Sequence, residues 1–259
     1  MKNLNLSFFN NLSNEDRILL NHIGDFVNLA TEKYITKFSF FLNQKQCALC
    51  EKLLKSLKFD NFKLYGGYDD AERKILCVFS DYDHITYDDF PIKSLVIRYS
   101  NNVTLTHRNI LGALMSLNIS RESIGDIIVS DDRAVVFVYD TISDLIKNDI
   151  TKIGRTGVAV SEESIDLKKE QSFEVIEGTV ASFRLDCIFA LALKTSREKA
   201  RTIISSKEVN INYFPVNKPD YLLKENDVFS IRGFGKFRFE SINGSTKKNR
   251  IHITLKKYI

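Results

Sequence analysis

In the first third of the chain, apolar residues recur every three or four positions, which predicts helices. Ser13 followed by Asp16 forms a capping pair at the start of the first helix. Its apolar face holds Ile18, Leu19, Ile23, Phe26, Val27 and Ala30. The same spacing predicts further helices over residues 31–42 and 44–57. Residues 1–60 are therefore expected to form a helical N-terminal domain.

The hydrophobic pattern changes after residue 60, where short apolar and β-branched runs predict strands. These strands cover residues 74–79, 95–99, 126–129 and 134–139. Helical patterns lie between and after them, over 108–117 and 141–150. This order predicts a small α+β domain over residues 61–160. Polar residues 161–180 fit either a linker or an edge strand, near 173–176, that begins the next unit.

The last third predicts one compact unit over residues 181–259. An apolar helix over 182–193 precedes a second helix over 197–206, which Thr195 or Ser196 can cap. Short strands follow over 208–211, 228–231, 235–242 and 250–255. The whole chain is thus expected to be an α+β protein with a helical first domain, an α/β middle domain and a C-terminal module.

Composition indicates the class of protein and the compartment in which we expect it. The 259 residues are 44% hydrophobic, enough for real cores, and no apolar run approaches the roughly 18 residues of a membrane helix. The N-terminus lacks the pattern of a secretory signal. Four cysteines are too few for a disulfide scaffold. We therefore expect a cytoplasmic monomer that has no membrane contact.

Charge is distributed unevenly along the chain. The net charge is +4, but residues 181–259 carry 16 Lys and Arg against 7 Asp and Glu, a net of +9, which leaves −5 for the rest. A compact basic module on an acidic body predicts a polyanionic partner for the C-terminal third. The alternative is a basic surface that only aids solubility.

Aromatic residues stand among the basic residues of this module. Phe234 and Phe237 alternate with Arg232, Lys236 and Arg238, and the second helix carries Arg197, Lys199 and Arg201. Cations beside rings suit irregular RNA, because the cations bind phosphates and the rings stack on bases. The alternative is that both phenylalanines belong to the sheet core.

The module resembles a known RNA-binding family. Its segment 181–213 has Arg184-Leu185-Asp186, then Ser196-Arg197 with Ala200, then Val209 and Asn212, and it resembles the αL module first described in ribosomal protein S-four. The continuation from Asp227 to Phe237 also fits, whereas Tyr213 stands where many members have Gly. The resemblance implies that the second helix and the following loop bind structured RNA. We expect RNA contacts at Arg184, Ser196, Arg197, Lys199, Arg201, Lys207, Arg232, Lys236 and Arg238. Asn212 either contacts RNA or stabilises its turn.

Nearly the whole chain resembles YlmH-type proteins. The matching segments are Tyr65–Lys74, Thr106–Met115, and Arg121 with Gly125-Asp126-Ile127. The resemblance implies a ribosome-associated factor that contacts rRNA and tRNA on the large ribosomal subunit during rescue of stalled translation. It also implies an RRM-like middle domain. Arg108 in that domain either contacts RNA or caps or pairs locally at a helix start.

The middle domain lacks the aromatic-basic run of a typical RRM. Its strand over 134–139 offers Phe137 and Tyr139, but Asp131, Asp132 and Asp140 flank it. We therefore expect this domain to contact protein, or to contact RNA through another face. Gly66 and Gly67 are explained by a turn that needs positive φ.

Catalytic patterns are absent from the sequence. Cys47 and Cys50 have metal-ligand spacing but no second pair, so buried thiols are expected and no metal site is predicted. No Gly-rich cofactor turn follows a strand, and no cofactor is predicted. Arg184-Leu185-Asp186 resembles the motif of pseudouridine synthases, whose Asp is the nucleophile, but here we expect Asp186 to orient Arg184.

The sequence therefore predicts a non-catalytic binding protein. Five phosphate contacts imply a log–log salt slope of about −3 to −5. Replacing Arg197 and Arg201 by Ala is expected to weaken RNA binding with little loss of thermal stability. The alternatives are an RNA-modifying enzyme anchored by the αL module, and a cell-division adaptor with an exposed apolar patch on its acidic N-terminal half.

Overall fold

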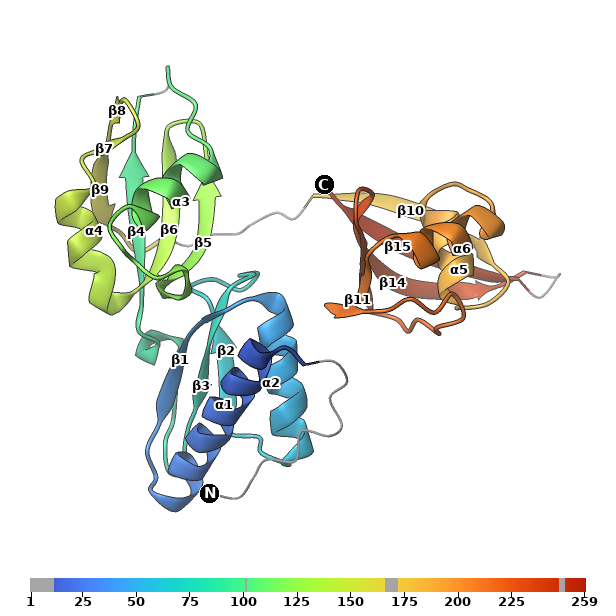
Figure 1. The fold of residues 1–259 in the computed structure, drawn as a ribbon, viewed down its shortest axis with the longest axis horizontal. Helices are drawn as coiled ribbons and strands as arrows, with labels where there is room; N and C mark the ends of the chain where they lie inside the picture. The colour runs from blue at the N-terminus through green and yellow to red at the C-terminus, as the bar shows by residue number, and fades with distance from the viewer. Residues whose placement is uncertain (1–11, 101, 166–171, 247–249) are drawn as a thin grey trace. The chain divides into compact units, whose positions relative to one another are not determined.

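The computed structural model describes residues 12–100, 102–165, 172–246 and 250–259 (Figure 1). The chain divides into two compact units, Met1–Lys168 and Lys169–Ile259. Helices and sheets occur in both units, which confirms the α+β class. None of the helices described here is both long and apolar enough to cross a membrane.

The first layer of unit 1 packs two helices beside a three-stranded antiparallel sheet ordered β1-β3-β2. The Ser13 hydroxyl accepts a hydrogen bond from the Asp16 N–H at 3.1 Å, so the predicted capping pair is confirmed. The elements are α1 (Asn14–Glu32), β1 (Lys37–Leu42), α2 (Gln44–Ser56), β2 (Phe62–Tyr65) and β3 (Lys74–Val78). Residue 60, the expected domain boundary, lies between α2 and β2 of this layer.

The helix predicted over residues 31–42 is wrong. After α1 ends, Tyr34 takes a left-handed conformation (φ 56°), and the Ile35 N–H donates back to the Leu29 carbonyl at 3.1 Å. That turn stops the helix. Residues 37–42 then form β1, which pairs with β3 and buries Phe41. Phenylalanine favours strands when a partner strand is present, and here the partner lies more than thirty residues later in the chain.

The second layer of unit 1 is a four-stranded antiparallel sheet ordered β5-β6-β4-β9. In the chain, strand–helix–strand is followed by strand–helix–strand, which is the split β-α-β arrangement. Helices α3 and α4 pack on one face, over Leu95, Ile97, Val136 and Val138. The elements are β4 (Ile92–Arg98), α3 (His107–Met115), β5 (Ile124–Val129), β6 (Arg133–Tyr139), α4 (Ser143–Asp149) and β9 (Ala159–Glu162), with the short pieces η1 (Tyr87–Asp89), η2 (Arg121–Ser123), η3 (Asp140–Ile142), β7 (Lys152–Ile153) and β8 (Thr156–Gly157).

The other face of this sheet is covered by the first layer. Phe137 is 2% exposed and belongs to one core with Phe41 of β1 and Tyr68 of the loop after β2. Tyr139 packs against Phe40, with ring centroids 5.4 Å apart. The two layers of unit 1 therefore share a hydrophobic core.

A loop that carries part of the YlmH-like pattern fastens the two layers. The Asp126 carboxylate on β5 accepts hydrogen bonds from the Tyr68 hydroxyl (2.7 Å) and from the backbone N–H groups of Glu72 (2.7 Å) and Arg73 (3.1 Å). Gly67 has φ +100°, and a Cβ there would lie 2.2 Å from the Phe137 ring. The predicted need for glycine at this turn is confirmed at Gly67.

Unit 2 packs two helices on one face of a six-stranded antiparallel sheet ordered β10-β15-β14-β13-β11-β12. Its core contains Phe189 of α5, Ile204 of α6, and Phe229, Phe237 and Phe239 of the sheet. The elements are β10 (Phe173–Val180), α5 (Leu185–Ala192), α6 (Arg197–Ser206), β11 (Val209–Ile211), β12 (Phe214–Pro215), β13 (Val228–Ile231), β14 (Gly235–Ser245) and β15 (Ile251–Tyr258). Of the two alternatives for residues 173–176, the edge strand is correct.

Candidate nucleic-acid interface

The two helices of unit 2 begin at defined caps. The Ser196 hydroxyl accepts a hydrogen bond from the Lys199 N–H at 3.2 Å, which starts α6 where the sequence predicts it. The first turn of α5 is anchored by Leu185 N–H to the Tyr221 carbonyl (2.8 Å) and by Asp186 N–H to the Pro219 carbonyl (3.0 Å). These anchors fix Asp186 at the start of α5.

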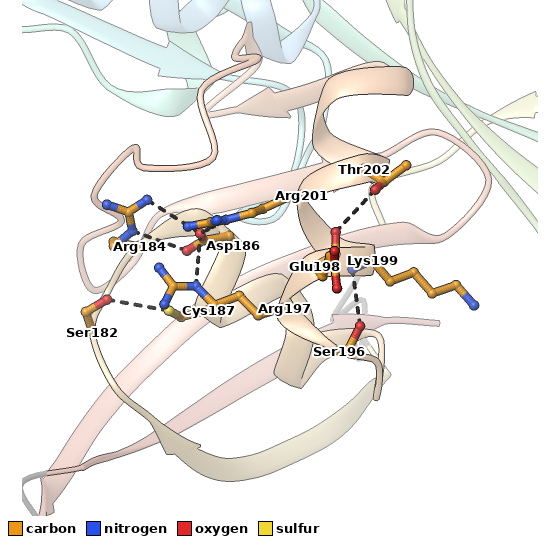
Figure 2. Close-up of polar contacts among 10 residues, drawn as sticks. All are labelled: Ser182, Arg184, Asp186, Cys187, Ser196, Arg197, Glu198, Lys199, Arg201 and Thr202. Carbon is orange, nitrogen blue, oxygen red and sulfur yellow. Dashed lines mark hydrogen bonds and ion pairs between the residues drawn. The ribbon is translucent and has the colours of Figure 1, made fainter.

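Three arginines converge on the Asp186 carboxylate (Figure 2). Arg201 Nε donates at 2.8 Å, Arg197 Nε at 3.0 Å, and Arg184 Nε at 3.3 Å. Asp186 itself is 0% exposed, whereas the side chains of Arg197 and Arg201 remain 46% and 51% exposed. We call these four residues the arginine cluster; it presents three guanidinium groups around one buried carboxylate.

The arginines keep Asp186 ionised. Burial alone raises the pKa of a carboxyl, but the hydrogen bonds from Arg201, Arg197 and Arg184 outweigh burial and hold the pKa of Asp186 well below its usual range. The bonds to Asp186 from Arg197 and Arg201 use Nε, so each guanidinium directs its outer edge away from the carboxylate. Such a planar edge is suited to binding a phosphate through two parallel hydrogen bonds.

The buried carboxylate corrects one expectation about stability. We expected Ala at Arg197 and Arg201 to leave thermal stability almost unchanged, but both arginines neutralise a fully buried Asp186. Removing both leaves that carboxylate with Arg184 as its remaining arginine partner, and an undercompensated buried charge is costly. The double alanine variant is therefore expected to be destabilised.

Other predicted contacts lie near the helices but outside the arginine cluster. Lys199 is exposed on α6 and points away from Asp186 in Figure 2. Lys207, directly after α6, places its Nζ 5.8 Å from the Phe234 ring centroid. Arg232 is exposed in the β13–β14 turn, 3.8 Å from the Glu208 carboxylate. Phe234 is 38% exposed, so it is not part of the core, whereas Phe237 is.

Lys236 and Arg238 lie on the opposite side of the sheet. Phe237 and Phe239 of β14 point into the core below the helices, and side chains alternate along a strand. Lys236 and Arg238 must therefore point away from the helices. The structure thus separates the predicted contacts of this unit into a helical side and an open sheet face.

Asn212 is engaged in its own turn. Its amide donates to Asp227 Oδ1 at 2.8 Å, and its side-chain oxygen accepts from the Val228 N–H at 3.0 Å. Asn212 and Tyr213 both have positive φ, of 47° and 70°. These contacts support the turn-stabilising alternative for Asn212.

The remaining predicted contact belongs to unit 1. Arg108 is exposed in the first turn of α3. The usual RNA surface of an RRM is the open face of its sheet, but here Phe137 is buried under the first layer. The middle sheet thus offers no open aromatic platform at Phe137.

The cysteine pair is placed partly as expected, because Cys50 is buried whereas Cys47 is half-buried. Cys50 is fully buried, and burial raises the pKa of the Cys47 thiol to about 12. Both side chains therefore stay protonated at neutral pH. Across the described ranges, no three His, Cys, Asp or Glu side chains gather in a way that would hold one metal ion.

The sequence analysis did not predict that Phe173 and Tyr258 lie together on the open sheet face, the side of the unit 2 sheet that faces away from the helices. The strand predicted over 250–255 continues as β15 to Tyr258, and Phe173 lies opposite it on β10. The signal was present in the alternation of His252, Thr254, Lys256 and Tyr258, which continues past the expected strand end.

Comparisons with known proteins show which family the chain resembles. Residues 86–167 match the family described as "Putative RNA-binding domain in YlmH". The chain is 30% identical over 248 residues to the Bacillus subtilis (strain 168) protein "Ribosome-associated protein quality control protein P2", a match that covers 94% of this chain and 95% of that protein. It is also similar to the solved structure "Cell division protein ylmH from Streptococcus pneumoniae", with 28% identity, a TM-score of 0.51, and coverage of 60% of this chain and 95% of that chain. Identity at this level over nearly the full length of both proteins shows that the chain belongs to the YlmH family.

Proposed function

We propose that this protein is a ribosome-associated RNA-binding factor that acts in quality control of stalled translation. The arginine cluster carries the proposal, because it holds three guanidinium groups around one buried carboxylate. Guanidinium groups held in this way can bind phosphate. The name of the Bacillus relative supports the ribosome and the quality-control role. The partner is structured rRNA or tRNA on the large subunit, and the protein acts as a monomer.

The protein acts by binding, without chemistry. In pseudouridine synthases the Asp of the similar motif is the nucleophile, and a nucleophile must touch its substrate. Asp186 is 0% exposed and lies beneath three arginines, which hold it in its charged form. Its place in the arginine cluster supports a positioning role.

The experiment is cosedimentation of the full chain with separated ribosomal subunits across a salt series. Lys199→Glu is the test variant, because Lys199 is exposed on α6 and its side chain points away from the buried carboxylate. Lys55→Glu, an exposed lysine on α2, is the matched control. We expect salt-sensitive retention on large subunits that Lys199→Glu weakens about tenfold and Lys55→Glu leaves unchanged. Equal retention of all three proteins, or none on any particle, would reject the proposal.

An exposed apolar patch on unit 1 supports a second candidate function, that of a cell-division adaptor. Ile18 of α1 and Phe40 of β1 are 57% and 54% exposed and line the same pocket of unit 1. An exposed apolar patch on the acidic half is what a cell-division adaptor requires. Capture of a division protein that Ile18→Lys abolishes, with ribosome binding intact, would favour that function.

A further inference from the structure

The sheet of unit 2 has a second face, opposite the helices. On β15, Ile253 and Leu255 face the core with α5 and α6, so Thr254, Lys256 and Tyr258 face the other way. By the same alternation, β10 turns Val175 to that face, where it is 56% exposed. Both helices pack on the core side. The residues used below are each half-buried and are named together as the open sheet face; they are Phe173, Tyr213, Lys236, Arg238, Lys256 and Tyr258.

Aromatic rings and a lysine form one row across this face. Phe173 of β10 lies opposite Tyr258 of β15, with ring centroids 5.0 Å apart in an edge-to-face arrangement. The Lys236 Nζ lies 4.8 Å from the Tyr258 ring and 5.5 Å from the Tyr213 ring. The lysine is therefore held between two tyrosines, and three rings are brought to one end of the sheet.

Cations form the next row. Lys256 lies opposite Arg238, and its Nζ is 5.3 Å from the Phe173 ring. Glu240 contacts both cations, at 2.9 Å from Lys256 and 3.1 Å from Arg238. Alternation along β10 also places the exposed Glu177 carboxylate on this face. The three cations Lys236, Arg238 and Lys256 therefore outnumber two carboxylates, and the open sheet face keeps a positive balance beside its rings.

Rings next to cations on an open sheet suit one ligand class. Unpaired bases stack on aromatic rings, while neighbouring Lys and Arg hold the phosphates that link them. A duplex buries its base faces and cannot stack in this way. We propose that the open sheet face binds two or three unpaired nucleotides of RNA, separately from the arginine cluster. This proposal rests on the proposed RNA-binding function and adds a second contact of different chemistry.

The test is fluorescence anisotropy of the full chain with a labelled decauridine at several salt concentrations. Tyr258→Leu keeps apolar packing but removes the ring, and Tyr258→Phe keeps the ring. We expect Tyr258→Leu to weaken binding about fivefold to a hundredfold, and Tyr258→Phe to bind within about twofold of the wild type. The salt slope should not change in either variant, because a tyrosine neutralises no phosphate.

Two further variants extend the test, and a comparison with Lys199→Glu separates this proposal from the proposed function. Lys236→Gln should weaken binding and reduce the salt slope by about 0.7, the value of one phosphate contact on a single strand. Tyr82→Leu, at a ring that is 79% exposed in unit 1, should change nothing. Suppose that Tyr258→Leu binds decauridine like the wild type while Lys199→Glu weakens retention on large ribosomal subunits. The open sheet face is then rejected and the proposed function stands. If neither variant has an effect, both are rejected.

Discussion

Asp186→Asn is the most informative single change for the stability of unit 2. The substitution keeps the shape of the side chain but removes the negative charge on which Arg184, Arg197 and Arg201 converge. Its amide nitrogen also brings a donor toward guanidinium groups that are donors themselves. Three positive charges then remain together with no carboxylate between them.

The cost follows from the contact geometry. A hydrogen bond to a charged group contributes about 1.5–3 kcal/mol. Arg197 and Arg201 are about half exposed, so solvent screening reduces each of their bonds to about 1 kcal/mol. The longer bond from Arg184, at 3.3 Å, adds about 0.5 kcal/mol. The variant should therefore lose about 2–3 kcal/mol, which lowers the melting temperature of a unit of this size by about 10–20 °C.

Hydrogen exchange followed by mass spectrometry is the suitable assay, because peptides from α5 and α6 report on unit 2 alone. Asp220→Asn, an exposed carboxylate in the same unit, is the matched control and should change neither unit. A loss below about 0.5 kcal/mol in Asp186→Asn would refute this account of the arginine cluster.

The same variant has a defined pH dependence. The pKa of Asp186 is lower in the folded protein than its unfolded value near 3.9. Such a group stabilises the fold fully above its unfolded pKa, and the contribution fades as the pH falls toward the folded pKa. The stability difference between wild type and Asp186→Asn should thus be constant above about pH 5 and shrink below about pH 4.

Three further predictions concern other parts of the chain. Gly67→Ala should destabilise unit 1 by about 2–4 kcal/mol in urea unfolding, because φ is +100° and the new Cβ meets Phe137, whereas Gly157→Ala, with open space around it, should have little effect. Asn212→Ala should lower the stability of unit 2 by about 1–3 kcal/mol with an unchanged salt slope for RNA, because its side chain is engaged within the turn; a changed slope would show phosphate contact instead. Cys47 should resist iodoacetamide at pH 8 until the protein unfolds, since its pKa is raised to about 12 by burial, and rapid alkylation of the native protein, seen by mass spectrometry, would contradict this.

Unit 2 was predictable where the signals are local. The Ser196 cap and the apolar spacing after it placed α6 at Arg197–Ser206, and alternation placed β13 at Val228–Ile231. The same alternation around Phe237 could have separated Lys236 and Arg238 from the helical contacts. The ion pairs of Arg197 and Arg201 with Asp186 could not be predicted from the sequence, because they depend on how α5 and α6 pack against each other.

Unit 1 shows where local patterns fail. Residues 37–42 contain three phenylalanines and fit a helix or a strand equally well, and the choice is made by pairing with β3. The role of Asp126 was likewise hidden, since the groups it binds at Tyr68, Glu72 and Arg73 lie more than fifty residues earlier in the chain. Contacts between distant segments leave no periodic signal at either end.

The covered face of the middle sheet has a consequence for how this protein can be divided. A fragment cut to the family match, residues 86–167, would keep β4, β5, β6 and β9 but lose β1 and the loop that holds Tyr68. Val135 and Phe137, now 5% and 2% exposed, would then face water beside Ile128. Such a fragment would expose an apolar surface with an aromatic ring that is buried in the intact chain. Through this face the fragment would bind single-stranded RNA or a second copy of itself. RNA affinity measured on the fragment would therefore include binding to this newly exposed face. The full-length protein should be used to map the RNA contacts of this family.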